Sequence, residues 1–190
     1  MQAFTEALSA KLRNDIATAT TNEDKLKLAD KLVQISHTEG SAGMSYAAQS
    51  LARDYYKEVG NLARFFQSVT DLKTKYRGSD LDRVAIDAVK EFATTIRDPI
   101  GSAELAKVCL DLADDLAENG MVDAAPEIMT IARESAQLAK HKHYQSLVLA
   151  ATRRLSTLAE EELRIKPFRE ALARDGANPE ANLCLLYTSP

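Results

Sequence analysis

The sequence contains no tryptophan, and only seven of its 190 residues are glycine and five are proline. Glycine and proline are the residues that most often interrupt a helix, so few positions along the chain are expected to break one. Alanine, leucine, lysine, glutamate and aspartate dominate instead. Such a composition is typical of packed helices, and the chain is long enough for one domain with a sizeable core.

Long apolar runs are absent as well. No run approaches the roughly 18–20 residues that cross a membrane. Residues 1–20 lack the apolar core and the cleavage site of a signal peptide. As given, the chain is therefore expected to be soluble and without a membrane span.

Basic residues are in the minority. The chain has 24 lysines and arginines but 28 aspartates and glutamates, which gives a net charge of -4. A general nucleic-acid binder needs a basic surface to neutralise phosphates. The sequence therefore argues against nucleic acid as a partner.

The residue patterns of catalytic and metal sites are also missing. His141 and His143 are two positions apart, so on a helix they point to different sides and form no facial metal pair. No Glu-x-x-His, His-Glu-x-x-His, glycine-rich phosphate loop or Gly-x-Ser-x-Gly turn occurs. The carboxylates of Asp111, Asp114 and Asp115 favour a solvated helix face over an acid–base pair or an ion site. We expect no enzyme, cofactor, metal or small-molecule ligand.

Helical periodicity is what the sequence does contain, most clearly in residues 102–140. These residues predict two antiparallel helices joined by a turn at Asn119 and Gly120, each with one apolar face. The two faces consist of Leu105, Cys109, Leu112 and Leu116, and of Ala125, Met129, Ala132 and Ala136. We interpret Cys109 as a small core residue, because helical spacing places no histidine or charged activator beside its thiol.

The rest of the chain also reads as helices. The pattern predicts them at residues 2–19, 22–38, about 41–59, 62–76, 81–97 and 143–174. Asp98 and Pro99 are expected to end the helix at 81–97. Gly78, Ser79 and Asp80 are expected to stop one helix and cap the next. Pro167 predicts a kink or a break near Lys166.

Residues 41–76 form a second predicted hairpin. When Gly60 is aligned with Gly120, seven apolar positions of this hairpin match positions of residues 102–140 in type. A hairpin buries only one face by itself, so neighbouring hairpins must stack to complete a core. The sequence therefore predicts an all-α fold, a short stack of antiparallel hairpins or α-solenoid, that ends in a long helix. Chance agreement between helix pairs is the alternative to a true repeat.

Aromatic residues gather around this second hairpin. Tyr46, Tyr55, Phe66 and Tyr76 are its candidate interaction surface, because exposed tyrosines are effective anchors in a recognition groove. The alternative is that they belong to the core.

The last seven residues, 184–190, carry no charge and follow no helical face. They resemble the translation of a transposase adapter that is used to prepare sequencing libraries. We therefore interpret them as an artefact, which leaves a chain truncated near Leu183 at the start of a further repeat. Without Cys184, Cys109 is the only native cysteine, no intrachain disulfide is expected, and cysteine usage does not identify the compartment.

The leucine–alanine spacing, the glycine turn and the spaced alanines of residues 112–132 resemble tetratricopeptide-like helical repeats. The usual tryptophan is missing, and the glycines lie further apart than one such repeat. Residues 20–183 more closely resemble the helical region of large multidomain proteins of planctomycete-type bacteria. That resemblance implies an upstream signal peptide, downstream modules and an extracytoplasmic location, and it carries over no catalytic residues.

The sequence thus divides into a helical-repeat region at 1–140, a long helix with the start of a further repeat at 141–183, and the adapter-like end. We expect a non-enzymatic scaffold or spacer of a larger protein, which contacts proteins or neighbouring domains of the same chain. The alternatives are a peptide-binding module with an aromatic groove and an accessory domain of an enzyme whose catalytic part lies elsewhere.

Overall fold

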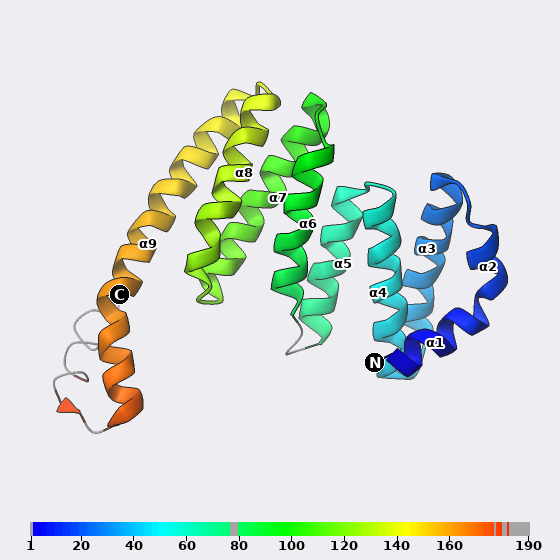
Figure 1. Ribbon diagram of the computed structural model, residues 1–190, viewed down its shortest axis with the longest axis horizontal. Coiled ribbons are helices and arrows are strands. Elements are labelled where there is room, and N and C mark those ends of the chain that lie inside the picture. The colour runs from blue at the N-terminus through cyan, green and yellow to red at the C-terminus, as the bar shows by residue number, and fades with distance from the viewer. Residues whose placement is uncertain (1, 77–79, 177, 180–181, 183–190) are drawn as a thin grey trace.

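The computed structural model describes residues 2–76, 80–176, 178–179 and 182, and every regular element among them is helical (Figure 1). The prediction of an all-α protein is confirmed. The elements are α1 (Gln2–Lys11), α2 (Arg13–Thr18), α3 (Asn22–Thr38), α4 (Ala42–Glu58), α5 (Leu62–Lys75), α6 (Leu81–Thr95), α7 (Pro99–Glu118), the short 3₁₀ helix η1 (Val122–Ala124), α8 (Ala125–Leu138) and α9 (Lys142–Arg174).

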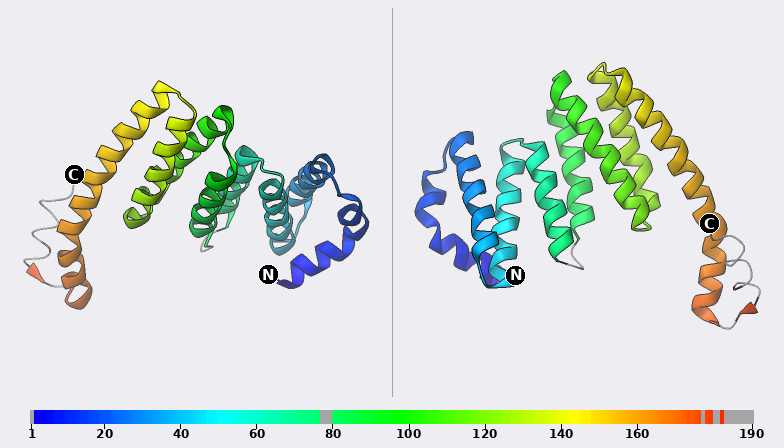
Figure 2. Two further views of the ribbon diagram at one scale, coloured as in Figure 1. Left: turned by 45° about the horizontal axis from the view of Figure 1, so that its top comes forward. Right: turned by 180° about the vertical axis from the view of Figure 1, so that it is seen from behind.

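From α3 onward, each long helix runs antiparallel to the one before it, and the helices lie side by side in a curved row (Figures 1 and 2). Helix α3 packs closely on α4, and α7 packs closely on α8. Helices two places apart also touch, since α5 meets α7, α7 meets α9 and α6 meets α8. Alternate helices therefore share a layer, with α5, α7 and α9 in one layer and α6 and α8 in the other.

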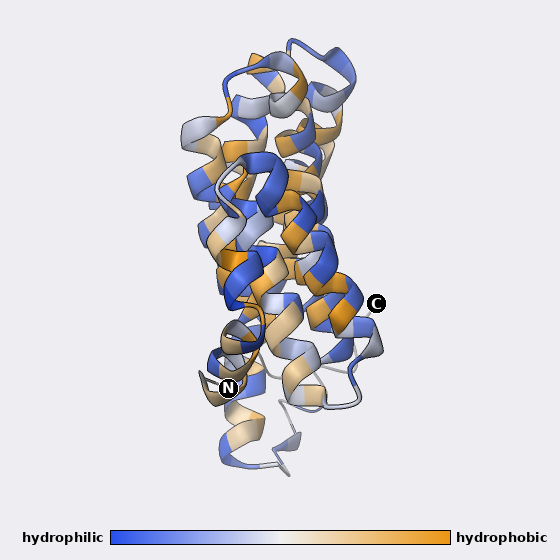
Figure 3. Cartoon of the chain, turned by 90° about the vertical axis from the view of Figure 1, so that its right-hand side faces the viewer, coloured by the Kyte–Doolittle hydropathy of each residue, from blue (hydrophilic) through white to orange (hydrophobic). Residues whose placement is uncertain are grey.

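One continuous apolar core runs along this row, from Leu8 in α1 to Leu155 in α9. Hydrophilic and hydrophobic residues alternate around the helices, as amphipathic helices require (Figure 3). The eight residues predicted to form the two apolar faces of residues 102–140 are all buried. In α7 and α8 the 3.6-residue period was sufficient to identify the core.

The two predicted glycine turns are built alike. Gly60 and Gly120 have φ angles of +75° and +74°, the left-handed region in which glycine is favoured. After α4, the N–H of Asn61 donates to the carbonyl of Tyr56 over 2.8 Å, and after α7, Met121 donates to Leu116 over the same distance. Both turns are Schellman motifs. In Figure 1 the α4–α5 turn lies at the upper ends of its two helices and the α7–α8 turn at the lower ends of its two, so the two hairpins open in opposite directions.

The turn between α8 and α9 also contains a residue in the left-handed conformation, but this residue is not a glycine. Lys140 lies there with a φ of 52°. A left-handed conformation costs an ordinary L-residue about 1–2 kcal/mol. Replacement by glycine would remove this cost. Glycine is also more flexible in the unfolded chain, however, and this offsets part of the gain in stability. We therefore expect Lys140→Gly to raise the free energy of unfolding by about 0.5–1 kcal/mol. Urea unfolding measures the change, and Arg153→Gly, at an exposed position inside α9, should instead lower stability.

Two predicted helix boundaries were wrong. The helix expected over residues 2–19 is broken at Leu12; α1 packs against α4, and α2 contacts α3. Helix α6 ends at Thr95, before the proline that was expected to stop it. Asp98 and Pro99 begin α7 instead: the Asp98 carboxylate accepts a hydrogen bond from the N–H of Gly101 over 2.8 Å, and proline suits the first helical position.

Helix α9 is continuous through Pro167. Of the two predicted outcomes, a kink or a break near Lys166, the break does not occur. Its axis bends in the orange part of the ribbon in Figure 1. Pro167 cannot donate to the carbonyl of Leu163, one turn before it, which accounts for a bend in that part. Only Val148 and Leu155 of α9 are buried, and Leu158 and Leu163 are exposed. The apolar pattern of α9 therefore overstated how much of this helix is covered.

Some predictions lie outside the described residues. These are the helix stop at Gly78 and Ser79, the further helix at 180–183 and the adapter-like residues 184–190. Asp80 precedes α6, and its side chain makes no capping hydrogen bond. None of the described helices is both long and apolar enough to cross a membrane.

Cys109 lies in the centre of the core, with no exposed surface. Burial raises the pKa of its thiol to about 12. The thiolate is the reactive form, so a buried thiol of this kind is inert near neutral pH. In a Cys184→Ser variant, where Cys109 is the only cysteine, we expect almost no reaction with a thiol reagent at pH 8 until the protein is unfolded. Rapid labelling under native conditions would contradict the burial of Cys109.

Candidate functional site

The four aromatic residues predicted as an interaction surface lie in three separate places. All four are half-buried. Tyr46 and Tyr76 form an edge-to-face pair, with ring centroids 4.9 Å apart. Tyr55 lies on α4, close to Glu58 and Lys25, and burial raises the pKa of its hydroxyl. Phe66 lies on α5 and lines a pocket. The structure therefore brings only two of the four together.

Two adjoining pockets lie on the layer that contains α5, α7 and α9. The first, which we call the α5–α7 pocket, has a volume of about 650 Å³. The second, the α7–α9 pocket, has a volume of about 500 Å³. Lys107 and Asp111 of α7 line both pockets. We call the two pockets and the ridge of α7 between them the α5–α7–α9 face.

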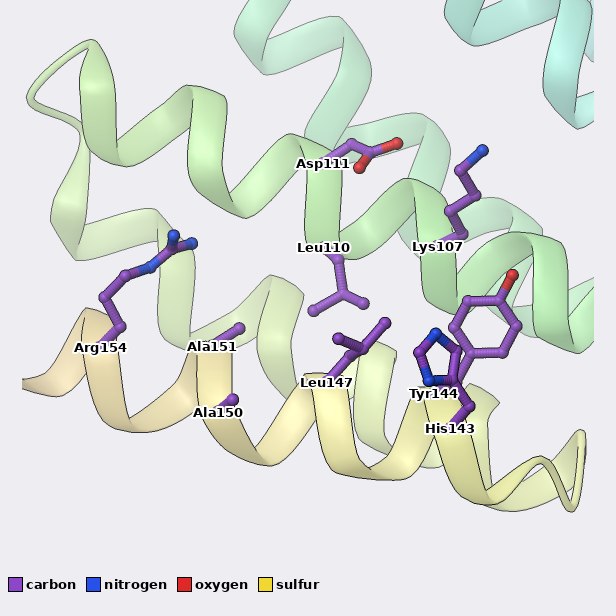
Figure 4. Close-up of a pocket in the computed structure, with 9 residues that line it drawn as sticks. All are labelled: Lys107, Leu110, Asp111, His143, Tyr144, Leu147, Ala150, Ala151 and Arg154. Atoms are coloured by element: carbon purple, nitrogen blue, oxygen red, sulfur yellow. The ribbon is translucent and has the colours of Figure 1, made fainter.

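The α7–α9 pocket has an apolar centre and polar ends (Figure 4). Leu110 of α7 and Leu147 of α9 point toward one another across it, with Ala150 and Ala151 beside them. Arg154 lies at one end of the pocket, and His143 and Tyr144 lie at the other. Leu147 keeps 40% of its surface exposed and so contributes apolar surface to the pocket.

The α5–α7 pocket has a similar character. Its apolar lining comes from three helices and consists of Ala63, Phe66, Val69, Ala85, Val108 and Leu112. Its polar lining includes Lys73, Glu104 and Asp115. Nine of its fifteen lining residues are polar, which is a larger share than is usual for a binding pocket.

The charged residues of the α5–α7–α9 face fall into two groups. Lys73 forms ion pairs with Asp82 of α6 and Asp115 of α7, and Arg154 forms one with Asp114. Ion pairs thus connect α5, α6, α7 and α9. Among the described residues, no ion pair joins Glu104, Lys107 or Asp111 to any side chain, although all three line a pocket.

The surroundings of Asp111 alter the pKa of its carboxyl group. Asp111 as a whole residue is exposed, but neighbouring atoms partly bury its carboxyl group. This partial burial raises the pKa of Asp111, Lys107 lowers it to a lesser extent, and Asp114 raises it. The charged carboxylate therefore lacks the compensation that Asp114 and Asp115 receive from Arg154 and Lys73.

A nucleophile and an amine do meet elsewhere in the structure. The Nζ of Lys75 donates to the Oγ of Ser45 over 2.7 Å. Ser45, however, is only 2% exposed, and its hydroxyl donates to the carbonyl of Ser36 over 2.6 Å. A substrate cannot reach this hydroxyl without displacing packed helices, so the pair joins α3, α4 and α5 structurally. The described residues also contain no group of three or more His, Cys, Asp and Glu side chains that could hold a metal ion.

Sequence reasoning identified Phe66 but missed most of the α5–α7–α9 face. Lys107, Tyr144 and Leu147 had no distinguishing pattern. Asp111 was grouped with Asp114 and Asp115 as a solvated face. The three differ only through the helices that pack near them. A comparison of the chain with protein-family models, with curated proteins and with solved structures found no match in any of the three.

Proposed function

We propose that this chain is a non-enzymatic helical-repeat module, similar to tetratricopeptide repeats, that holds other proteins or neighbouring domains through its α5–α7–α9 face. The observation that supports this most is the pair of adjoining pockets that share Lys107 and Asp111.

The arrangement of the helices supports a repeat scaffold. Contacts between α5 and α7, α7 and α9, and α6 and α8 fit two layers of alternating helices, which is the architecture of an α-solenoid. In such a protein each helix pair buries its apolar face against the next pair. The side chains that remain at the surface of one layer then form an extended face along the array.

The chemistry of that face supports binding. Protein interfaces depend on a few apolar or aromatic anchors that enter pockets, surrounded by polar groups. The α5–α7–α9 face offers two such pockets next to each other, with the half-buried Phe66 in one and the exposed Leu147 in the other.

The binding function can be tested by selecting a phage-displayed library of random 12-residue peptides on the immobilised 190-residue chain. We expect enriched peptides whose binding is lost in Leu147→Glu, which places a charge in the α7–α9 pocket. Glu134→Lys, on the exposed surface of α8, is the matched control and should bind as the unmodified chain does. Enriched peptides that bind both variants equally would place the interaction elsewhere and contradict the proposal.

The non-enzymatic part has its own test. A ligand at about 100 times its Kd stabilises the folded state by about 2.7 kcal/mol, which raises Tm by several degrees. We expect no such shift with divalent metals or nucleotides. A clear metal-dependent rise in Tm would contradict a plain scaffold.

A further inference from the structure

One carboxylate, that of Asp111, lies on the ridge of α7 between the two pockets. Asp111 lines both pockets, and no hydrogen bond or ion pair to its carboxylate is found within the described part of the chain. The shielding that raises its pKa also means that water solvates the charge incompletely. A positively charged group brought to this position would gain more than at a fully solvated carboxylate.

The other charges of the face leave a negative balance around Asp111. The cations Lys73 and Arg154 are already paired with carboxylates of this chain. Of the lining residues without an ion pair, Glu104 and Asp111 are acidic and only Lys107 is basic, with no ion pair between them. An acidic segment would meet Asp111 and the nearby Asp114, while a basic side chain would meet a carboxylate that Lys107 compensates only in part.

Apolar surface lies on both sides of the same ridge. On the α9 side, Leu110 and Leu147 form the centre of the α7–α9 pocket. On the α5 side, Phe66, Val108 and Leu112 line the α5–α7 pocket. A chain that crosses α7 therefore passes an apolar pocket, a carboxylate and a second apolar pocket in that order.

We propose that the α5–α7–α9 face binds an extended peptide segment of a partner protein in which a lysine or arginine lies between two large apolar residues. The basic side chain pairs with Asp111, and one apolar side chain enters the pocket on each side of α7. This inference rests on the proposed function and adds the chemistry of the partner.

The same peptide selection tests the inference when its sequences are analysed. We expect enriched peptides to contain Lys or Arg with a large apolar residue on either side. Resynthesised peptides, measured by fluorescence polarisation, should bind at least tenfold more weakly to Asp111→Asn and still more weakly to Asp111→Lys. Replacing the basic residue of the peptide by Glu should restore part of the binding to Asp111→Lys. The control Glu134→Lys should leave the affinity unchanged, and thermal unfolding of each variant confirms that the fold is retained.

The possible results separate the two proposals. Peptides that require Leu147 but are indifferent to Asp111→Asn, or that are acidic, would overturn the inference and leave the proposed function standing. Selection of no peptide that depends on Leu147 or Asp111 would overturn both. The charge exchange between Asp111→Lys and a Glu-containing peptide is the decisive measurement, because a merely structural role of Asp111 would not produce rescue.

Discussion

Replacement of Phe65 by alanine is expected to lower the free energy of unfolding by about 3–5 kcal/mol, the range of phenylalanine truncations in protein cores. Phe65 has no exposed surface and contacts two other rings edge-on, Phe66 at 5.0 Å and Phe92 at 5.7 Å between centroids. These rings join α5 to α6 at the middle of the row. The variant therefore loses apolar burial, aromatic contacts and packing at once.

Phe66→Ala is the matched control, because it removes the same side chain at the next position of the same helix. Phe66 is only half-buried and lies on the wall of the α5–α7 pocket. We expect it to cost clearly less than Phe65→Ala in urea unfolding. Equal costs would mean that the two rings share the core evenly, contrary to their exposures.

The fold could be predicted from the sequence wherever a local rule was sufficient. Apolar spacing identified the buried faces of α7 and α8, and Gly60 and Gly120 marked turns whose hydrogen bonds turned out to be the same. Both signals depend on residues within one or two turns of each other. Pro99 was misread because a proline that follows one helix can equally begin the next, and only the bond from Gly101 to Asp98 distinguishes the two.

The site could be predicted only in part, because its properties arise between helices. Phe66 was selected as an aromatic residue, but its pocket is completed by side chains of α6 and α7. Of Asp111, Asp114 and Asp115, only Asp111 has a basic residue at helical spacing, Lys107, yet no ion pair joins the two. Asp114 is compensated by Arg154, 40 residues away, and Asp115 by Lys73, 42 residues away. No local pattern indicates which of three aspartates will remain without a partner.

The second large effect on stability is expected from replacing Lys73, because the ion pairs of this side chain connect three helices. It extends from α5, is mostly buried, and binds Asp82 of α6 and Asp115 of α7. Lys73→Met keeps much of the apolar stem but leaves two carboxylates without their shared cation. We expect a loss of about 1–3 kcal/mol, the range for hydrogen bonds to charged groups and for unpaired, partly buried charges. Lys90→Met, which breaks one exposed ion pair with Glu127, should cost no more than about 1 kcal/mol.

The pH dependence of this loss identifies its electrostatic origin. Burial by itself would lower the pKa of Lys73, but the hydrogen bonds to Asp115 and Asp82 outweigh it, and the pKa is raised above the ordinary 10.5. A raised pKa in the folded state means that the folded protein holds this proton more tightly than the unfolded chain. The contribution of Lys73 is therefore complete below pH 10.5 and is lost as the pH rises through the folded-state pKa. Urea unfolding of the unmodified protein and Lys73→Met should show a constant difference from neutral pH upward that shrinks above pH 10.5. A difference that stays the same there would assign the effect of Lys73 to the packing of its stem.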